Sequence, residues 1–459
     1  MHKPAQKSAR TKPTGYTKDE LIDCAAKGAY GTLIPAKLAL TSPHTISAFL
    51  ERIRNTDDQR FFLRKFDAAA ASDVLSEMEP DVAAEVLSAM RESRAVNILE
   101  ALDPDDAADL VRALESSHRE RLLHKVDPAT AATVRKLIRF HPQTAGGIMT
   151  PEVAMVNKEM TAAQAIEAVR ALHQQLETID YFYVVDDAAH LEGVVSMRDL
   201  VFSQPDQQLA TSMTSDLKGV CHLNTDQEAV ALKMTEHNFR ALPVVDDNNR
   251  LVGIVTHDDV LDVMQEEATE DLQKMVGAGA DETVYDDLLA SVRGRSPWLL
   301  MNLITAFLAG GVVMLFQERI AELTLLAACL PIIASLGGNT GAQTLAIIIR
   351  SLALGEITAK DSRWICIKEG TKGLLSGILI GLAAGAIAGL FANNLRTAEV
   401  VFFAMLLTMT FASIAGAFIP LLLQKLHLDP AQSSSIFLTA STDIVGFAIF
   451  LGLSNWMLF

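Results

Sequence analysis

Five long apolar segments in the second half of the chain constrain its fold more than any other feature. A bilayer core of about 30 Å requires roughly 20 apolar residues of α-helix. A helix buried in a soluble protein rarely stays this apolar this often. The sequence therefore predicts an all-α membrane domain, 296–459, with five transmembrane helices. We place the spans at about 297–317, 323–349, 370–392, 398–424 and 433–457.

The distribution of charge separates this half from the first 295 residues. From Ser296 to Phe459 the sequence holds eight basic and eight acidic residues, so the whole excess of 17 negative charges lies before Ser296. An acidic surface repels nucleic acid and attracts cations, which argues against a nucleic-acid partner. The four cysteines are widely spaced, without a CxxC motif, so neither a zinc site nor a disulfide framework is expected.

The loops between the spans predict the orientation. Arg350–Lys372 carries five Lys and Arg residues, whereas the loops around Arg319 and Arg396 carry one each. By the positive-inside rule, the loop with five is cytoplasmic. We therefore expect a multi-pass protein of the cell (inner) membrane, with its acidic N-terminal half in the cytoplasm and its C-terminus outside.

A 24-residue repeat organises the beginning of the acidic half. Pro80, Pro104 and Pro128 each follow an acidic residue, which is typical of a helix N-cap followed by its first helical position. Repeated pairs of short helices stack into an α-solenoid, which we place at 45–142. We interpret residues 1–44 as a poorly ordered extension that is helical in part.

A second repeat has a period of 60 residues. Val184-Val185-Asp186-Asp187 returns as Val244-Val245-Asp246-Asp247, and each unit predicts a helix, a β-hairpin and another helix. The pattern resembles a pair of α/β CBS modules, which often bind adenosine nucleotides. That resemblance makes Thr256 and Asp259 candidate ribose contacts; the alternative is a pair that only dimerises and packs. The two modules are placed at 143–206 and 207–265.

Asp443 is the only acidic residue deep in any predicted span. It lies 14 residues after Asp429, so about 20 Å along a helix from the cytoplasmic edge. A charge at that depth costs ~3 kcal/mol or more, and no Lys or Arg lies deep in a span to pair with it. We interpret Asp443 as part of a conduction path. A proton relay or a locked hydrogen bond is the alternative.

The second span contains helix-weakening residues. Pro331 precedes Gly337–Gln343, a run with three glycines. A break there either lines a cavity or permits close helix packing, and the amides of Asn339 and Gln343 favour the cavity.

The connector between the CBS pair and the first span, 266–295 with the preceding turns, is strongly acidic. Read as a helix, it repeats like charges at i, i+3 and i+4 spacing, which costs stability unless a counter-ion is bound. A solvated acidic face is the alternative. Hard divalent cations with oxygen ligands remove that repulsion, and their release lets acidic surfaces separate, which makes a ligand-driven switch. The acidic residues concerned are Asp259, Asp262, Glu266, Glu267, Glu270 and Asp271, with a further pair, Asp105 and Asp109, in the solenoid.

Together these features resemble the MgtE family of magnesium channels over residues 45–459. The resemblance rests on the order of the parts and on four motifs. These are Gly337–Gln343, Arg350–Glu356, Glu267–Asp271, and Ser441–Asp443 with Gly446.

The resemblance implies a homodimer with the pore at its two-fold axis. Asp443 would bind largely hydrated Mg²⁺, with Thr439 and Asn339 lining the pore, and ATP would bind the CBS pair with Phe239 as an aromatic contact. Cytoplasmic Mg²⁺ would close the acidic surfaces together, and the connecting plug helix would hold the pore shut. The implied Mg²⁺ ligands of this sensor are Asp105, Asp109, Asp259, Asp262, Glu267, Glu270, Asp271 and Asp429.

The chain departs from the family pattern at Ala342, Ser435 and Asn238, where an amide, an Asn and an acidic residue are usual. Two other functions remain open. One is transport of another divalent ion, such as Mn²⁺ or Co²⁺, or coupled exchange; the other is a non-conducting membrane sensor. An enzyme is not expected, because the sequence has no phosphate loop, no catalytic triad pattern and no zinc motif.

Overall fold

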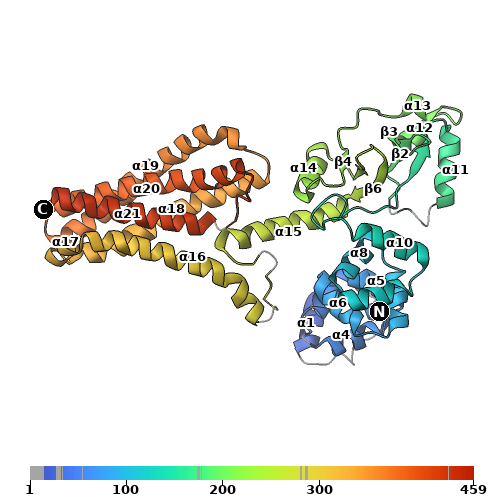
Figure 1. Cartoon of the computed structure of the whole chain (residues 1–459), viewed down its shortest axis with the longest axis horizontal. Coiled ribbons are helices and arrows are strands. Elements are labelled where there is room, and N and C mark those ends of the chain that lie inside the picture. Colours follow the sequence, from blue (N-terminus) through green and yellow to red (C-terminus); the bar gives the residue numbers. More distant parts are fainter. Residues whose placement is uncertain are drawn as a thin grey trace, which may run out of the picture. The chain divides into compact units, whose positions relative to one another are not determined.

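The computed structural model describes residues 15–26, 33, 35–53, 55–172, 176, 178–279, 282–284, 288–432 and 434–459. The chain divides into two compact units, Met1–Val263 and Met264–Phe459. The first contains a helical domain and two small sheets, and the second contains the long helices (Figure 1).

Short helices build the helical domain, and the acidic–proline repeat explains where three of them begin. Pro80, Pro104 and Pro128 occupy the first turns of α6, α8 and α10, where proline's missing N–H is not needed. The apolar face of each helix is buried in one shared core. The helices are α1 (Lys18–Ala26), α2 (Pro35–Leu38), α3 (Pro43–Leu50), α4 (Thr56–Leu63), α5 (Ala68–Ser76), α6 (Pro80–Ser88), α7 (Glu92–Leu99), α8 (Pro104–Ala113), α9 (Ser116–Leu123) and α10 (Pro128–Leu137).

The N-terminal stretch differs from the expected extension. Helix was expected in part of it, but Leu21 of α1 and Leu38 of α2 are fully buried in the core of the helical domain. The Tyr16 backbone N–H also donates to the Thr41 hydroxyl at 2.8 Å. Two helices this short give little periodic signal, which is why the sequence did not reveal their packing. Residues 1–14, 27–32 and 34 lie outside the described part of the chain.

The 60-residue repeat forms two sheets of identical topology. In each, the first strand is parallel to the second, and the second is antiparallel to the third. Val184 pairs with Gly193 in one sheet as Val244 pairs with Gly253 in the other. The α/β pair predicted from the repeat is therefore confirmed. Its elements are β1 (Met155–Asn157), α11 (Ala162–Leu172), β2 (Tyr181–Val185), β3 (Leu191–Ser196), α12 (Met197–Phe202), α13 (Leu209–Ser212), β4 (Cys221–His222), α14 (Gln227–His237), β5 (Ala241–Val245) and β6 (Leu251–Thr256).

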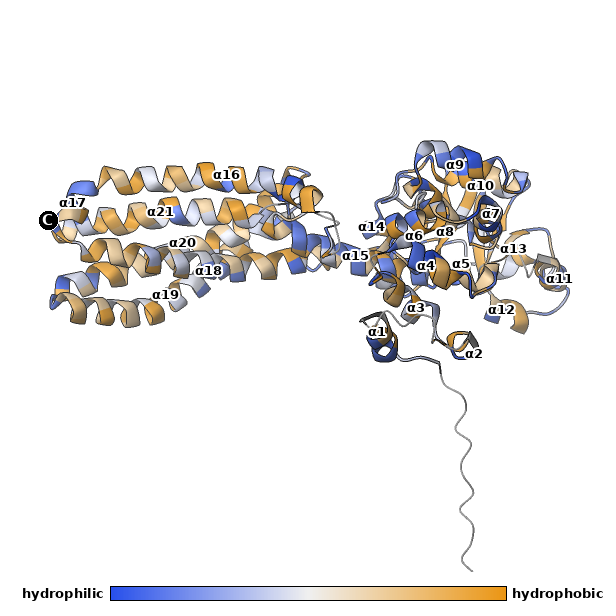
Figure 2. Cartoon of the chain, turned by 90° about the horizontal axis from the view of Figure 1, so that it is seen from below, coloured by the Kyte–Doolittle hydropathy of each residue, from blue (hydrophilic) through white to orange (hydrophobic). Residues whose placement is uncertain are grey.

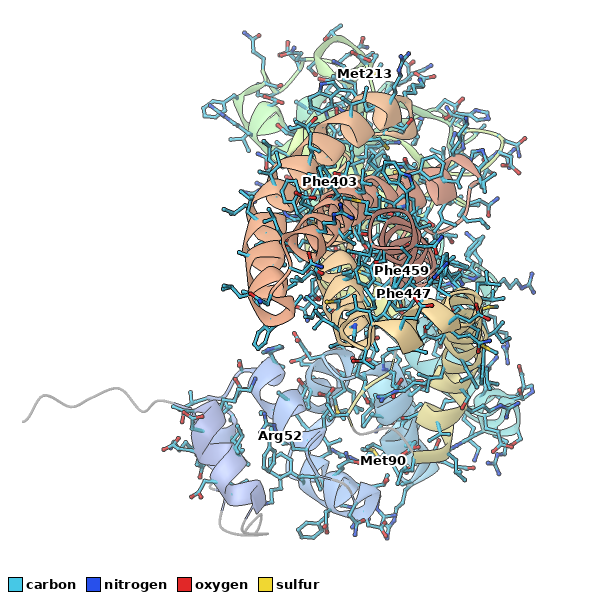
Figure 3. The ribbon with its side chains drawn as sticks, turned by 90° about the vertical axis from the view of Figure 1, so that its left-hand side faces the viewer. Arg52, Met90, Met213, Phe403, Phe447 and Phe459 are labelled. Atoms are coloured by element: carbon cyan, nitrogen blue, oxygen red, sulfur yellow. The ribbon has the colours of Figure 1, made fainter. Side chains whose placement is uncertain are left out.

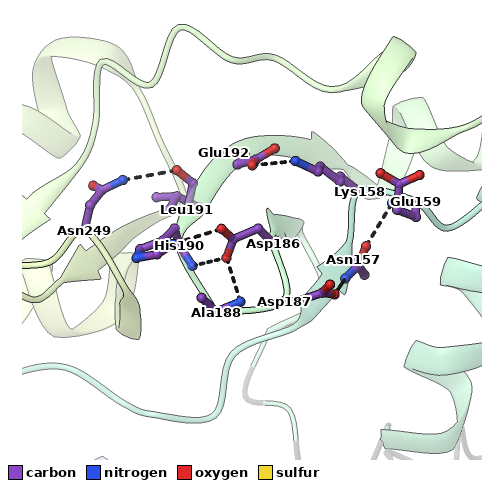
Figure 4. Close-up of polar contacts among 10 residues, drawn as sticks. All are labelled: Asn157, Lys158, Glu159, Asp186, Asp187, Ala188, His190, Leu191, Glu192 and Asn249. Atoms are coloured by element: carbon purple, nitrogen blue, oxygen red, sulfur yellow. Dashed lines mark hydrogen bonds and ion pairs between the residues drawn. The ribbon is translucent and has the colours of Figure 1, made fainter.

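The polar turn of each hairpin is built by its aspartate. The Asp186 carboxylate accepts the backbone N–H groups of Ala188 and His190 at 2.9 and 2.8 Å, as Figure 4 shows. Asn249, from the equivalent turn of the second module, donates to the Leu191 carbonyl at 3.3 Å. The two turns therefore fix both hairpins and join the modules to each other.

Among the described residues, five helices are long and apolar enough to cross a membrane, and Figure 2 shows apolar residues along most of their length. The five are α16 (Leu288–Leu315), α18 (Leu325–Ala353), α19 (Ser362–Ala392), α20 (Leu395–Lys425) and α21 (Ser434–Met457). Three of them, α16, α19 and α20, begin before the predicted spans, because helical hydrogen bonding continues past the apolar boundary into the charged turns. The remaining elements are α15 (His257–Val276), α17 (Gln317–Glu322) and a 3₁₀ turn at Ala359–Asp361.

Helix α18 runs without a break through Pro331 and the glycine run, so the expected weakening of the helix is not observed. The glycines serve close packing instead. Gly341 lies against Leu438 of α21 and the Ala412 carbonyl of α20, and Gly416 of α20 lies directly on the Gly341 carbonyl. Small residues let these backbones approach, which offsets the low helix propensity of glycine.

We expect Gly416→Ala to destabilise the membrane unit by about 1–3 kcal/mol, because the added Cβ collides with the backbone of α18. Gly338→Ala is the matched control, since nothing lies within 4 Å of its Cβ position. Thermal unfolding of both variants in detergent measures the difference. Equal unfolding temperatures would contradict this account of the helix crossing.

Candidate functional site

Asp443 lies on a half-exposed face of α21. Thr439, one turn earlier, is exposed, whereas Thr442 and Gly446 are buried on another face. Gly446 packs against Thr408 of α20 and Ile333 of α18, so close packing fixes the helix that carries the carboxylate. The apolar sequence of α21 thus holds one acidic side chain at the surface of the five-helix unit.

A second polar face lies on α18. Asn339 and Gln343, one turn apart, are exposed, while Gly337 and Gly341 are buried against neighbouring helices. Amide side chains exposed to lipid hydrocarbon would lack hydrogen-bond partners, so such a face requires water or another protein surface. In a single chain, this face is left open.

Lys274, near the end of α15, lies between two carboxylates. Its ammonium is 2.9 Å from Asp429 and forms an ion pair with Glu270, which is 9% exposed. Burial opposes the charge on Lys274, but the hydrogen bonds that its ammonium donates to Glu270 and Asp429 outweigh this effect and raise the lysine pKa above its usual value. The lysine therefore neutralises carboxylates that were expected to bind a cation.

The last turn of α15 packs on the ends of the long helices. The Ser435 hydroxyl of α21 donates to the Met275 carbonyl at 2.6 Å, and the Met275 side chain packs with Leu345 and Leu438. Burial raises the pKa of Asp271 to about 6, and the neighbouring Asp429 and Glu267 contribute. Two of the predicted sensor carboxylates, Glu267 and Asp429, thus act on a third, Asp271, within the second unit.

A second group of carboxylates lies within the first unit. Burial raises the pKa of Asp106, on α8, to about 7, and Asp259 and Asp103 add to the shift. Burial likewise raises the pKa of Asp259 to about 6, although the Thr256 hydroxyl and backbone N–H both donate to its carboxylate. Helix α8 and the start of α15 therefore present acidic side chains that resist being charged together.

The other predicted sensor residues of this unit occupy different environments. Asp109 is paired with Arg112, and burial still raises its pKa. Burial also raises the pKa of Asp262, with Glu77 and Asp258 contributing. Asp105 is buried, and its role in sensing stays a prediction.

Asp106 and Lys274 are the two residues that sequence reasoning missed. The sequence pattern paired Asp105 with Asp109 at i, i+4 spacing, but Asp106 is also a helical neighbour of Asp109, at i, i+3 spacing. Within the described ranges, no group of three His, Cys, Asp or Glu side chains is arranged to hold a metal ion.

A cavity of about 240 Å³ lies between the two CBS modules. Phe239 lines it, as expected for a nucleotide contact, whereas Thr256 and Asp259 do not. Their counterparts Ser196 and Asp199 do line it and are joined by a 2.6 Å hydrogen bond. Only the second module's pair was expected to contact a nucleotide, but the three-dimensional arrangement places the first module's pair at the cavity. Other lining residues include Tyr181, Tyr183, Asp216, Lys218 and Val220.

Family models match three parts of the chain. Residues 330–453 match a model described as divalent cation transporter, 41–143 match the MgtE intracellular N domain, and 145–205 and 209–266 each match the CBS domain.

Relatives match over most of their length. The chain is 36% identical to the magnesium transporter MgtE of Thermus thermophilus over 330 residues, which cover 71% of this chain and 73% of the relative. It is 33% identical to the Enterococcus faecalis transporter of the same name, covering 70% and 71%. A solved structure of the cytosolic domain of the Mg²⁺ channel MgtE in complex with ATP is 36% identical, with a TM-score of 0.49, and covers 53% of this chain and 98% of that one.

The fold and the matching models define a multi-pass membrane protein that carries a CBS pair and a divalent cation transporter domain. The relatives are named as transporters rather than enzymes. The chain belongs to the MgtE family of magnesium transporters.

The raised pKa values of Asp106 and Asp259 predict how the first unit responds to pH. The folded values, about 7 and 6, exceed the usual value of about 3.9 for an unfolded chain. Their stabilising contribution is therefore complete below pH ~4 and is lost as pH rises through 6 to 7. In EDTA, we expect the unfolding temperature of this unit to fall between pH 5 and 8. The expected fall is about 2–4 °C for each kcal/mol of unfolding free energy that is lost.

Calorimetry of the full chain with and without Mg²⁺ tests this expectation. Mg²⁺ should remove most of the fall at high pH, and Asp106→Asn should reduce it in EDTA. The same pH dependence in wild type and Asp106→Asn would show that this carboxylate does not carry the effect.

Proposed function

We propose that this transporter is a magnesium channel whose conduction path passes Asp443. The observation that carries the proposal is a single half-buried carboxylate on a membrane helix that has no other charged residue. Its charge is stable at that depth only beside water or a cation. Mg²⁺ dehydrates reluctantly and usually keeps several waters, so one carboxylate that contacts its hydration shell suits it better than a closed cage of ligands.

We propose that the channel is a homodimer with the pore between the two chains. Asn339, Gln343, Thr439 and Asp443 are polar and lie on faces that one chain leaves open. Pairing of two chains around a shared water-filled axis would place these groups in water and keep them out of lipid. An isologous two-fold arrangement is the commonest way to do so.

The proposed orientation follows from the positively charged loop. Arg350, Arg363, Lys368 and Lys372 lie at the facing ends of α18 and α19. With these on the cytoplasmic side of the cell membrane, the first unit is cytoplasmic and the C-terminus lies outside.

We propose that cytoplasmic Mg²⁺ closes the channel through the two carboxylate groups. In the first unit, Asp106, Asp109, Asp259 and their neighbours repel one another unless protonated or bound to a cation. Divalent ions would hold α8 and α15 together there. Because α15 is one continuous helix, the state of its first turns is transmitted to its last turn, which packs on α18 and α21.

Within this gate, Lys274 acts as a tethered cation. It bridges Glu270 and Asp429 when no metal is bound and so holds the end of α15 against the loop that precedes α21. An ammonium carries one charge and a fixed stem, whereas Mg²⁺ carries two charges and binds more oxygen ligands. The lysine thus keeps the channel partly closed without metal, and Mg²⁺ would shift the balance further toward the closed state.

We also propose an adenine nucleotide in the CBS cavity. Phe239 and the two tyrosines offer aromatic faces for a base, Asp199 offers a carboxylate for ribose hydroxyls, and Lys218 offers a charge for phosphate. The cavity takes groups from both modules, so an occupant would stabilise their pairing.

We expect Asp443→Asn to reduce Mg²⁺ flux into proteoliposomes to the level of empty liposomes, because the neutral amide no longer attracts the hydrated ion. Glu318→Gln, which removes a charge from α17 outside the apolar helices, is the matched control and should conduct normally. Competition by Mn²⁺ and Co²⁺ in the same assay measures ion selectivity. Normal flux through Asp443→Asn would refute the pore assignment, and no flux through wild type would favour a non-conducting sensor.

We expect Lys274→Met to raise channel activity when cytoplasmic Mg²⁺ is removed, because Glu270 and Asp429 are then left without a counter-charge. Each ~1.4 kcal/mol of lost closure corresponds to about tenfold in the closed-to-open ratio. Saturating Mg²⁺ should still close the variant. Lys274→Arg, which retains both ion pairs, should resemble wild type, and patch-clamp recordings compare the three. Identical currents without Mg²⁺ in Lys274→Met and wild type would exclude this role.

A further inference from the structure

A basic cavity lies in the helical domain of a protein whose first half is strongly acidic. Its volume is about 380 Å³, and its lining contains four arginines and no acidic residue: Arg60, Arg64, Met90, Arg91, Ser93 and Arg94. Met90, two residues after the end of α6, is labelled in Figure 3. The cavity is separate from the carboxylates and from the CBS cavity, whose residues it does not share.

Two of the arginines are fixed by the ends of neighbouring helices. Arg60 donates to the Ala89 carbonyl at 2.7 Å and pairs with Asp57 at 2.8 Å. Arg94 donates to the carbonyls of Leu63 and Phe66 at 2.9 and 2.8 Å. These contacts position both guanidinium groups and use only part of their donor capacity, since each guanidinium has five N–H donors.

Unused donors remain at the cavity. The Nε of Arg94 is buried without a hydrogen-bond partner, and leaving a buried donor unpaired is unfavourable. Within the described residues, no ion pair or side-chain hydrogen bond involves Arg64 or Arg91, which are exposed. Two positioned guanidiniums and two unengaged ones therefore converge on one space.

Helix α7 adds to the positive potential. Its N-cap is Arg91, which forms no side-chain cap, and its first turn holds Arg94 together with Glu92, whose charge is paired with Lys125. Helices α5, α6, α8 and α10 have an acidic residue at the N-cap instead. Cations at a helix N-terminus oppose the helix dipole and are stabilised when an anion binds there.

We propose that this cavity binds a small phosphate-bearing anion and gives the helical domain a ligand site separate from cation sensing. Planar guanidiniums bind phosphate oxygens in bidentate pairs, and a diphosphate offers enough oxygens for several of them at once. Asp57 offsets one of the four positive charges, which leaves a net excess suited to a polyvalent anion. The proposal does not depend on the channel function.

Isothermal titration of the full-length protein with inorganic diphosphate tests the site. The protein is held in phosphatidylcholine nanodiscs, in chloride buffer with EDTA. The test variant is Arg64→Gln with Arg91→Gln, because neither side chain has a structural partner to lose. The control is Arg52→Gln with Arg139→Gln, which removes the same charge from exposed arginines that do not line the cavity. Figure 3 labels Arg52 on the helical domain.

We expect saturable binding to wild type and the control, and a loss of affinity of about tenfold or more in the test variant. No saturable binding to wild type, or an equal loss in the control, would overturn the proposal. So would unchanged affinity in the test variant, because diphosphate would then bind elsewhere, such as in the CBS cavity.

A parallel titration in nanodiscs with phosphatidylglycerol distinguishes the source of the phosphate. Unchanged affinity supports a soluble ligand. A lower affinity for diphosphate in these nanodiscs, seen only when Arg64 and Arg91 are present, indicates that a lipid headgroup supplies the phosphate.

Discussion

The fold and the proposed function both depend on how carboxylates are kept charged in places that disfavour charge. In α21 the difficulty is greatest, because Asp443 is a half-buried carboxylate and is the one charged residue of that helix. Hydrocarbon does not solvate it, and no basic residue occurs deep in a span to pair with it. A doubly charged, hydrated ion is the partner that matches both its charge and its setting. The buried glycines of α18 and α20 serve this arrangement, because their close packing leaves the polar faces of α18 and α21 pointing away from the helix crossing.

The same constraint recurs outside the membrane helices in a milder form. Burial raises the pKa of Asp106 and Asp271, so a cation that binds them must also displace protons or relieve repulsion. The affinity of such a site responds to conditions, which suits a sensor better than a permanently occupied structural site. Helix α15 contributes to both carboxylate groups: Asp259 lies in its first turn and Asp271 in its fourth. One continuous helix therefore carries acidic residues of both units, which is what the proposed gating requires.

Much of this architecture could be predicted from the sequence, because the signals were periodic. The proline-marked helices and the hairpin pair followed from the spacing of the repeats, and the five membrane helices followed from the length of their apolar runs. The prediction was weaker where packing decides. Three glycines and Pro331 indicated a weakened helix, yet α18 is continuous, because glycines that cost helix propensity are compensated by contact with α20 and α21. Asp106 was missed for a related reason: a run of adjacent aspartates does not reveal which one faces α15. Lys274 was missed because its contact with Asp429 joins residues far apart in the sequence, which no local pattern indicates.

The role of Lys274 bears on why an acidic gate needs a basic residue at all. If Glu270 and Asp429 were left without a counter-charge, their repulsion would drive the end of α15 away from the start of α21 whenever the metal left. The contact would then have to form again from a separated state. A lysine between them keeps the contact formed while supplying only one charge. Under the proposed gating, metal binding then strengthens an existing contact. Smaller changes in free energy are needed to shift a balanced two-state element than one that strongly favours separation. The nearby hydrogen bond from Ser435 to the Met275 carbonyl supports the same contact without any charge, so closure does not depend on electrostatics alone.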